Sequence, residues 1–260
     1  MKIATWNVNG IKARIDNLCK WLEESSPDIA CLQEIKSVDE GFPASRIEEM
    51  GYHVETHGQK GFNGVALLSK VDPIEISRGL PGDDQDVQSR FISGIYPTNS
   101  GPITVGCLYL PNGNPVNTEK YPYKISWMRR LNTWAKQRLS LEQTFVLAGD
   151  FNVIPTSEDV HDPAAWQGDA LFRPETHREF QELLHLGLTE AFRACDSRPH
   201  QYSFWDYQRG ARQQNHGIRI DHCLLSPQMA DLLHSCHIES YVRDWERPSD
   251  HVPVVIKIDT

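Results

Sequence analysis

The chain has 260 residues, of which 39% are hydrophobic and 23% are charged, and its formal net charge is −9. This is the composition of an ordinary globular protein with a sizeable core, and the negative charge argues against indiscriminate nucleic-acid binding. The longest apolar runs are too short to span a bilayer, and the first residues read as a strand rather than a signal peptide. Six cysteines without a C-x-x-C pair indicate neither a disulfide framework nor a zinc site, so we expect a cytoplasmic protein.

The first part of the chain predicts a β-α-β unit. Residues 2–8 and 28–34 read as strands, and apolar residues recur at helical spacing between them. Such a unit implies parallel strands with a right-handed crossover. We therefore expect the polar ends of the strands, Asn7 and Asn9 on the first and Glu34 on the second, to emerge at the same edge.

The rest of the chain predicts hairpins interleaved with helices. Helices are expected near 43–50, up to about 139, through 180–184 and around 229–233, and strands near 52–56, 64–69, 74–78, 90–96, 103–110, 145–152, 201–205, 218–226, 238–242 and 252–258. No linker or low-complexity tract interrupts this pattern. The economical architecture is an α/β fold, a four-layer α/β/β/α sandwich of two packed mixed sheets with helices outside, forming one domain over 1–260.

The stretch from Phe145 to Asn152 is the most informative in the chain. Its apolar residues lead to Gly149, where the backbone can bend or be approached closely. Because strand side chains alternate between faces, Asp150 and Asn152 point one way and Phe151 points into the packing. Ligands of open α/β sheets gather at such strand ends. A strand followed by an ordinary Asx turn is the alternative, but three other polar clusters end apolar strands in the same way.

These polar strand ends together suggest a metal site with acid–base groups. They are Asn7, Asn9, Glu34, Tyr109, Asp150, Asn152, Asp221, Asp250 and His251. Hard oxygen donors of this kind suit Mg²⁺, with Mn²⁺ as a possible substitute. Each residue alone has an ordinary explanation: Glu34 as a loop cap, Asp221 as a partner of Arg219, His251 as a loop histidine.

Six motifs along the chain point to a known family. They are T-W-N-V-N-G at 5–10, L-Q-E at 32–34, L-Y-L-P-N at 108–112, G-D-F-N at 149–152, R-I-D-H at 219–222 and S-D-H at 249–251. In this order they resemble exonuclease III-type apurinic/apyrimidinic endonucleases of the endonuclease/exonuclease/phosphatase superfamily. The resemblance covers residues 2–258.

The resemblance implies a role for each strand-end group. Glu34, with Asn7 and Asn9, is expected to hold the metal, and Asp250 to serve the metal region. Asp150 is expected to take the proton from the attacking water, and Asp221 to orient His251, which donates to a phosphate oxygen. Asn112 and Asn152 are expected to donate to phosphate oxygens, and Tyr109 to contact the phosphate or assist the leaving oxygen.

Further residues are expected at the DNA interface. By the same resemblance, Phe204, Trp205 and Ile218, with Ile220, form an apolar pocket for a base-free sugar. Some relatives carry tryptophan in place of Ile218 and aspartate in place of Asn9, which leaves the balance of activities open. Basic candidates for phosphate contacts are Arg90, Lys120, Lys124, Arg129, Arg130, Arg209 and Arg212.

The resemblance thus implies a Mg²⁺-dependent hydrolase of DNA repair. It is expected to cut duplex DNA 5′ to abasic sites and to clean or trim blocked or recessed 3′ ends. We expect a monomer in the cytoplasm that associates with the nucleoid through its function and does not bind a membrane. Three alternatives stay open. They are a superfamily nuclease on RNA, a phosphatase on lipid or inositol phosphates, and a catalytically silent nucleic-acid-binding module.

Overall fold

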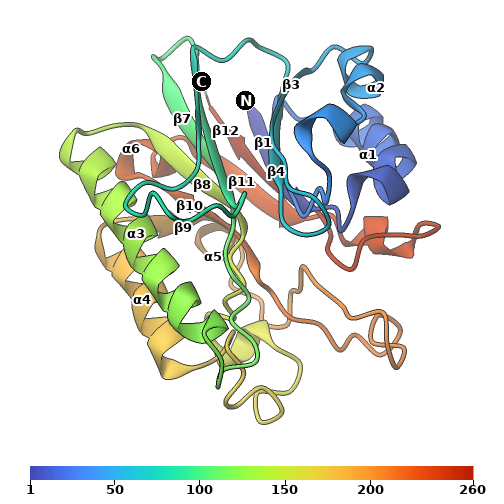
Figure 1. Cartoon of the computed structure of the whole chain (residues 1–260), viewed down its shortest axis with the longest axis vertical. Coiled ribbons are helices and arrows are strands. Elements are labelled where there is room, and N and C mark those ends of the chain that lie inside the picture. Colours follow the sequence, from blue (N-terminus) through green and yellow to red (C-terminus); the bar gives the residue numbers. More distant parts are fainter. Residues whose placement is uncertain (260) are drawn as a thin grey trace.

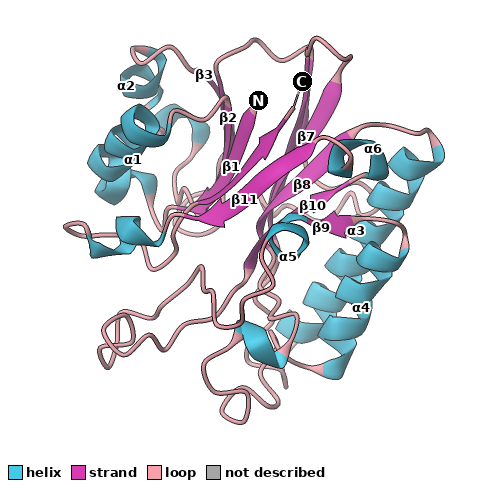
Figure 2. Cartoon of the chain, turned by 180° about the vertical axis from the view of Figure 1, so that it is seen from behind, coloured by secondary structure: helices cyan, strands magenta, loops and turns pink. Residues whose placement is uncertain are grey.

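The computed structural model describes residues 1–259 and contains two six-stranded mixed sheets packed face to face (Figures 1 and 2). The first sheet, in the order β11-β12-β1-β2-β4-β3, consists of β1 (Lys2–Asn7), β2 (Ile29–Gln33), β3 (His53–His57), β4 (Val65–Ser69), β11 (Leu233–Ile238) and β12 (Val254–Ile258). The second, in the order β5-β6-β7-β8-β10-β9, consists of β5 (Glu75–Arg78), β6 (Phe91–Tyr96), β7 (Ile103–Tyr109), β8 (Phe145–Asp150), β9 (Thr189–Glu190) and β10 (Asp221–Leu225).

Helices cover the outer faces of both sheets. Figure 1 shows α1 and α2 outside the first sheet and α3 and α4 outside the second. Their bounds are α1 (Ile11–Ser25), α2 (Ala44–Glu48), α3 (Lys120–Ser140) and α4 (Pro174–His185), with the shorter α5 (Ala191–Cys195) and α6 (Pro227–Ala230) and 3-10 turns at Asp39–Gly41, Ser157–Asp159 and Ser240–Asp244. The predicted four-layer α/β/β/α sandwich is confirmed. Within residues 1–259 no helix combines the length and the apolar composition needed to cross a bilayer.

The core follows from strands that are apolar on both faces. One cluster, with Ile3, Val105 and Val146 among its members, fills the space between the sheets. A second lies between the first sheet and α1, and a third lies between the second sheet and α3 and α4. Central strands are therefore buried on both sides, as their unbroken apolar runs indicate.

Two parallel strand pairs bring the polar strand ends to one rim. β1 pairs with β2, and β7 pairs with β8, in parallel. At the end of β8 the backbone passes very close to its neighbour, because a Cβ on Gly149 would lie 2.0 Å from the carbonyl oxygen of Leu108. Only glycine fits there. The expected close approach at this residue is confirmed.

Two predicted strands are wrong. Residues 201–205 form only isolated bridges, in which Phe204 pairs with Ile218 and His251. The strand expected at 238–242 lies earlier, as β11, and Ser240–Asp244 is a 3-10 turn. β11 is an edge strand with a register shift between Leu233 and Ser235 and several exposed polar residues. Its sequence therefore lacks the apolar pattern of the central strands.

A buried ionic cluster anchors the segment that leads into β10. Arg219 is 1% exposed, and it contacts Asp159 at 2.8 Å and Glu190 at 2.9 Å. Arg193 contacts Asp159 at 2.6 Å. Burial opposes ionisation of the two acids, but the charge of Arg219 outweighs it and lowers the pKa of both Asp159 and Glu190 to about 2. The suggested partner of Arg219, Asp221, instead faces the other way.

Replacing Arg219 by methionine should lower the free energy of unfolding at pH 7 by about 3–5 kcal/mol, because buried Glu190 loses its guanidinium partner and Asp159 keeps only Arg193. In the unfolded chain the two carboxyl groups have pKa values of about 4. The stability that Asp159 and Glu190 contribute is therefore complete above about pH 4 and is lost as the pH falls toward their folded pKa of about 2. The difference between the two proteins should therefore shrink on going from pH 7 to pH 3. Urea unfolding at both pH values measures it. An equal difference at both would contradict the ionic role.

Candidate active site

Asn7, at the end of β1, joins two carboxylates that come from different sheets. Its Nδ2 donates to Oε1 of Glu34 and to Oδ2 of Asp150, each at 3.0 Å. Glu34 follows β2 in the same sheet, whereas Asp150 ends β8 in the facing sheet. The structure thus brings Asn7, Glu34 and Asp150 together. The parallel pairing of β1 and β2 accounts for the predicted proximity of Asn7 and Glu34.

His251 lies between two buried carboxylates. Its Nδ1 is 2.8 Å from Oδ2 of Asp221, and its Nε2 is 3.7 Å from Oδ2 of Asp150. Asp221 stands opposite Asp150 in the β8–β10 ladder and accepts a further hydrogen bond of 2.6 Å from Ser203. The Asp221 carboxylate therefore fixes the orientation of the imidazole, and the Nε2 side faces Asp150.

Asn112 and Asn152 form a pair of amides at the ends of β7 and β8. Asn152 has a positive φ of 47°, a left-handed conformation that asparagine tolerates. Its backbone N–H donates to Asp150 at 2.9 Å, its Nδ2 donates to the carbonyl of Leu110 at 2.9 Å, and its Oδ1 accepts from Nδ2 of Asn112 at 3.1 Å. Both amides are therefore held beside Asp150.

Glu34 is surrounded by donors. Tyr109 donates its hydroxyl hydrogen to Oε1 at 2.8 Å, and the ammonium group of Lys36 lies 2.8 Å from Oε2. Lys36 also donates to Oδ1 of Asn9 at 2.5 Å, and Asn9 donates to Asp250 at 3.0 Å. The groups expected around the metal thus form a continuous polar rim.

The charges at this rim are set by burial and by their neighbours. Burial raises the pKa of Asp150 to about 7. Burial also opposes protonation of His251, but the carboxylates of Asp221 and Asp150 outweigh it and raise the pKa of His251 to about 10. For Glu34, burial is outweighed by hydrogen bonds from Lys36 and Asn7, which lower its pKa. A carboxylate poised near neutrality beside a cationic imidazole suits proton transfer at a charged centre.

A cavity opens next to His251. It has a volume of about 340 Å³, and its walls include Phe204, Ile218, Trp166 and Arg209. The ring of Phe204 packs edge-on against His251, with centroids 4.9 Å apart. The cavity therefore adjoins the imidazole through an aromatic wall.

The chain matches the Endonuclease/Exonuclease/phosphatase family over residues 4–251. It belongs to this family. Exodeoxyribonuclease III of Haemophilus influenzae is 36% identical over 262 residues, covering 98% of each chain. DNA repair nuclease APEX1 of Danio rerio is 30% identical over 263 residues, covering 98% of this chain and 81% of that protein. An AP endonuclease from Archaeoglobus fulgidus and the 3′-5′ exonuclease NExo from Neisseria meningitidis superpose with TM-scores of 0.94, at 35% identity and over 100% of both chains in each case.

The donor set of this family member fits a hard divalent cation in two places. Asp150, Asp221 and His251 form a compact group whose potential ligand atoms lie within 4.8 Å of one another. In that group Nδ1 of His251 is already hydrogen-bonded to Asp221, so ligation would compete with that contact. Glu34 offers an ionised carboxylate without an imidazole, but its oxygens accept from Asn7, Tyr109 and Lys36, so ligation there would compete with those contacts as well.

Four residues expected at the DNA interface lie elsewhere. Lys124 is fully buried, and its ammonium group donates hydrogen bonds to the backbone carbonyls of Asn112 and Asn152. It is therefore not available to DNA. Trp205 is 2% exposed and packs with Tyr202 in the cluster beneath the first sheet, since it points away from its neighbour Phe204. Ile220 is buried beneath the loops and is not part of the cavity wall. Arg212 is committed to Asp244 through two hydrogen bonds of 2.8 and 2.9 Å.

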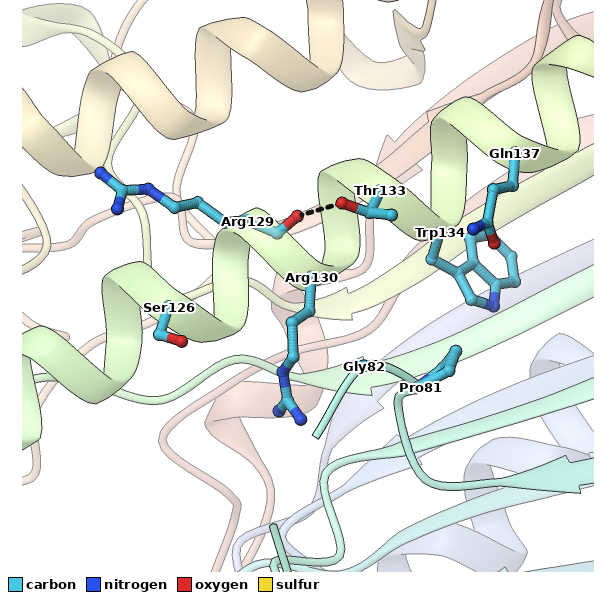
Figure 3. A pocket seen from close by; sticks show the side chains of 8 residues that line it. All are labelled: Pro81, Gly82, Ser126, Arg129, Arg130, Thr133, Trp134 and Gln137. Atoms are coloured by element: carbon cyan, nitrogen blue, oxygen red, sulfur yellow. Dashed lines mark hydrogen bonds between the residues drawn. The ribbon is translucent and has the colours of Figure 1, made fainter. Parts of the chain in front are cut away.

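Two further basic candidates lie on α3, around a separate hollow. Figure 3 shows Arg129 and Arg130 pointing in different directions from the helix, with Arg130 directed toward Gly82. Arg129 pairs with Glu179 at 2.9 Å, and Arg130 pairs with Asp86. By contrast, Arg90 and Lys120 border a small hollow beside Asn112, where they remain candidates for phosphate contacts.

Sequence reasoning missed several residues of the site. Lys36 lies two positions after Glu34, so its proximity could have been inferred from spacing. Ser203 reaches Asp221 from 18 positions away, and no local pattern signals that contact. The stacked pair His161 and His216, with centroids 4.7 Å apart, likewise comes from two separate loops that line the cavity.

Replacing Asp221 by asparagine should lower the pKa of His251 from about 10 toward its ordinary value of about 6.5, because the nearer of its two carboxylates loses its charge. NMR titration of the imidazole in the presence of a chelator measures this shift. An unchanged His251 titration would show that Asp221 does not hold the imidazole in its charged form.

Proposed function

We propose that this protein is a divalent-metal-dependent nuclease of DNA repair that cuts duplex DNA 5′ to abasic sites and trims or cleans 3′ ends. The observation that carries the proposal is the bridge from Asn7 to Glu34 and Asp150, with His251 alongside. It supports a single centre at which a cation, a base and an imidazolium act on one phosphate. Relatives named exodeoxyribonuclease III, AP endonuclease and 3′-5′ exonuclease support the same reaction class.

Mg²⁺ is the proposed cation, with Mn²⁺ as a substitute, held by Glu34 and Asn7 with Asn9 and Asp250 nearby. When bound there, such an ion supplies positive charge that polarises a phosphoryl oxygen and offsets the charge built up in displacement. The family is divalent-metal-dependent, and the oxygen-rich rim supports this assignment. Lys36 balances the charge of Glu34 and holds Asn9 in place.

The protein's own groups would carry the proton and the negative charge. Asp150 takes a proton from the water that attacks phosphorus, a role supported by its pKa of about 7. The bond from phosphorus to the 3′ oxygen breaks, and that oxygen leaves as a 3′-hydroxyl with a proton that balances the one taken from water. His251 is cationic at neutral pH and donates Nε2–H to a non-bridging phosphate oxygen, while Asp221 keeps its orientation. Asn112 and Asn152 donate amide hydrogens to other phosphate oxygens. Tyr109, which donates to Glu34, is close enough to this centre to contact the phosphate.

The cavity beside His251 supports the choice of an abasic site. Phe204 and Ile218 give it apolar walls suited to a deoxyribose, and Arg209 lies at its edge. Enzymes that act on extrahelical nucleotides bind them in pockets of this kind. A Neisseria relative has been solved with a product DNA hairpin, which supports DNA as the partner. We further propose a single catalytic domain that acts as a cytoplasmic monomer.

The proposed function is tested with purified protein on matched duplexes that carry an abasic analogue, a recessed 3′ end or neither. With Mg²⁺ we expect cleavage of the first two and little of the third. A chelator should abolish both activities, and added Mg²⁺ or Mn²⁺ should restore them. Cleavage that survives the chelator, or equal cleavage of all three duplexes, would refute the proposal.

Asp150→Asn should remove incision while leaving DNA affinity largely intact, because the variant keeps the shape of the site but replaces the base with a neutral amide, which can accept only one of the two hydrogen bonds from Asn7 and Asn152. The measurements are single-turnover cleavage and the Kd for an uncleaved abasic duplex. Asp231→Asn, a change at an exposed acid after α6, is the matched control and should cleave normally. Normal turnover in Asp150→Asn would rule out Asp150 as the base.

A further inference from the structure

Lys124 lies in the second turn of α3, yet its side chain is fully buried. Its Nζ donates to the carbonyl oxygen of Asn152 at 2.6 Å and to that of Asn112 at 3.1 Å. These residues stand in the loops that follow β8 and β7. One ammonium group on α3 therefore hydrogen-bonds to the backbone of both loops.

The same two residues present their amide side chains at the rim of the site. Nδ2 of Asn112 donates to Oδ1 of Asn152 at 3.1 Å, and Nδ2 of Asn152 donates to the carbonyl of Leu110 at 2.9 Å. A primary amide has two N–H groups, and the protein bonds described here use one from each residue. The second N–H of each amide is left for a phosphate oxygen. Its direction depends on the backbone that Lys124 holds.

The space around Lys124 is narrow. A Cβ added to Gly113 would lie 2.7 Å from its Cδ, so the loop after β7 is pressed against the lysine stem. Burial lowers the pKa of Lys124 to about 7, which shows how strongly this environment disfavours the ammonium charge. An apolar side chain would fill the same space without that penalty. What the ammonium group adds is a donor to two loops at once.

We propose that Lys124 is a positioning residue for phosphate chemistry. Its ammonium group holds the loops of Asn112 and Asn152 in one arrangement and thereby orients their side-chain amides toward the phosphate. This inference rests on the proposed function. Lys124 itself touches neither DNA nor the reacting atoms. Its effect passes through Asn152, whose backbone N–H also donates to the carboxylate of Asp150 at 2.9 Å.

The test compares Lys124→Met, Asn152→Ala and the double variant on an abasic duplex with Mg²⁺. We expect Lys124→Met to lower kcat by roughly tenfold to a hundredfold, the range caused by small misplacement of catalytic groups. KM and the Kd for uncleaved duplex should change by less than about twofold, since no DNA contact is lost. In the Asn152→Ala background, Lys124→Met should cause a smaller further loss of kcat than in the parent, because only the amide of Asn112 is then left to be misplaced.

Leu131→Ala is the matched control for lost packing on the same helix, since Leu131 is equally buried. At a temperature where thermal unfolding shows both variants folded, Leu131→Ala should keep kcat within about twofold of the parent. Lys124→Gln, a smaller neutral change with the same expected loss of kcat, replaces Lys124→Met if the latter fails to fold.

Three outcomes would overturn the inference: an unchanged kcat in Lys124→Met and Lys124→Gln, a rise in KM with kcat preserved, or full additivity with Asn152→Ala. The second would restore Lys124 as a phosphate contact. These outcomes are distinct from failure of the proposed function, which would appear as an inactive parent protein on every duplex.

Discussion

The site depends on one amide that spans two sheets. Asn7 ends a strand of the first sheet and donates to Glu34 in that sheet and to Asp150 in the other. Both carboxylates share one donor, so a shift of one sheet against the other would stretch at least one bond. The packing of apolar residues between the sheets therefore sets the spacing of groups at the rim. Catalytic geometry is here a consequence of how two sheets stack.

The buried charged side chains are stabilised because each one contacts groups of opposite charge and accepts or donates hydrogen bonds. His251 stands between the carboxylates of Asp221 and Asp150, while Arg219 links two acids on the far side of the same segment. Neighbouring residues of β10 illustrate the division. Asp221 faces the site, and His222 faces the other way, where it packs edge-on against Phe151. Alternation along one strand thus separates a catalytic network from a structural one.

The sequence allowed the layers, the first parallel pair and the residues of the rim to be predicted, because each rests on local chemistry. Apolar runs ending in Asn7, Glu34 and Asp150 point to parallel strand ends at one edge, and the structure brings those ends together. Edge elements were less predictable. β11 has the alternating, polar sequence of a strand that is buried on one side only, so its position was misjudged.

By itself the sequence determined which residue types stand at the strand ends and in which order, since period and motif are properties of neighbouring residues. Only the tertiary structure decided where long polar side chains lie and which groups they contact. Lys124 carries a full charge on a helix, yet it is buried, because two loops from distant positions turn their carbonyls toward it. Ser203 reaches Asp221 and Lys36 reaches Asn9 in the same way. The contacts of Lys124 and Ser203 join segments that meet only when helices and loops pack onto the sheet, so no local pattern encodes them.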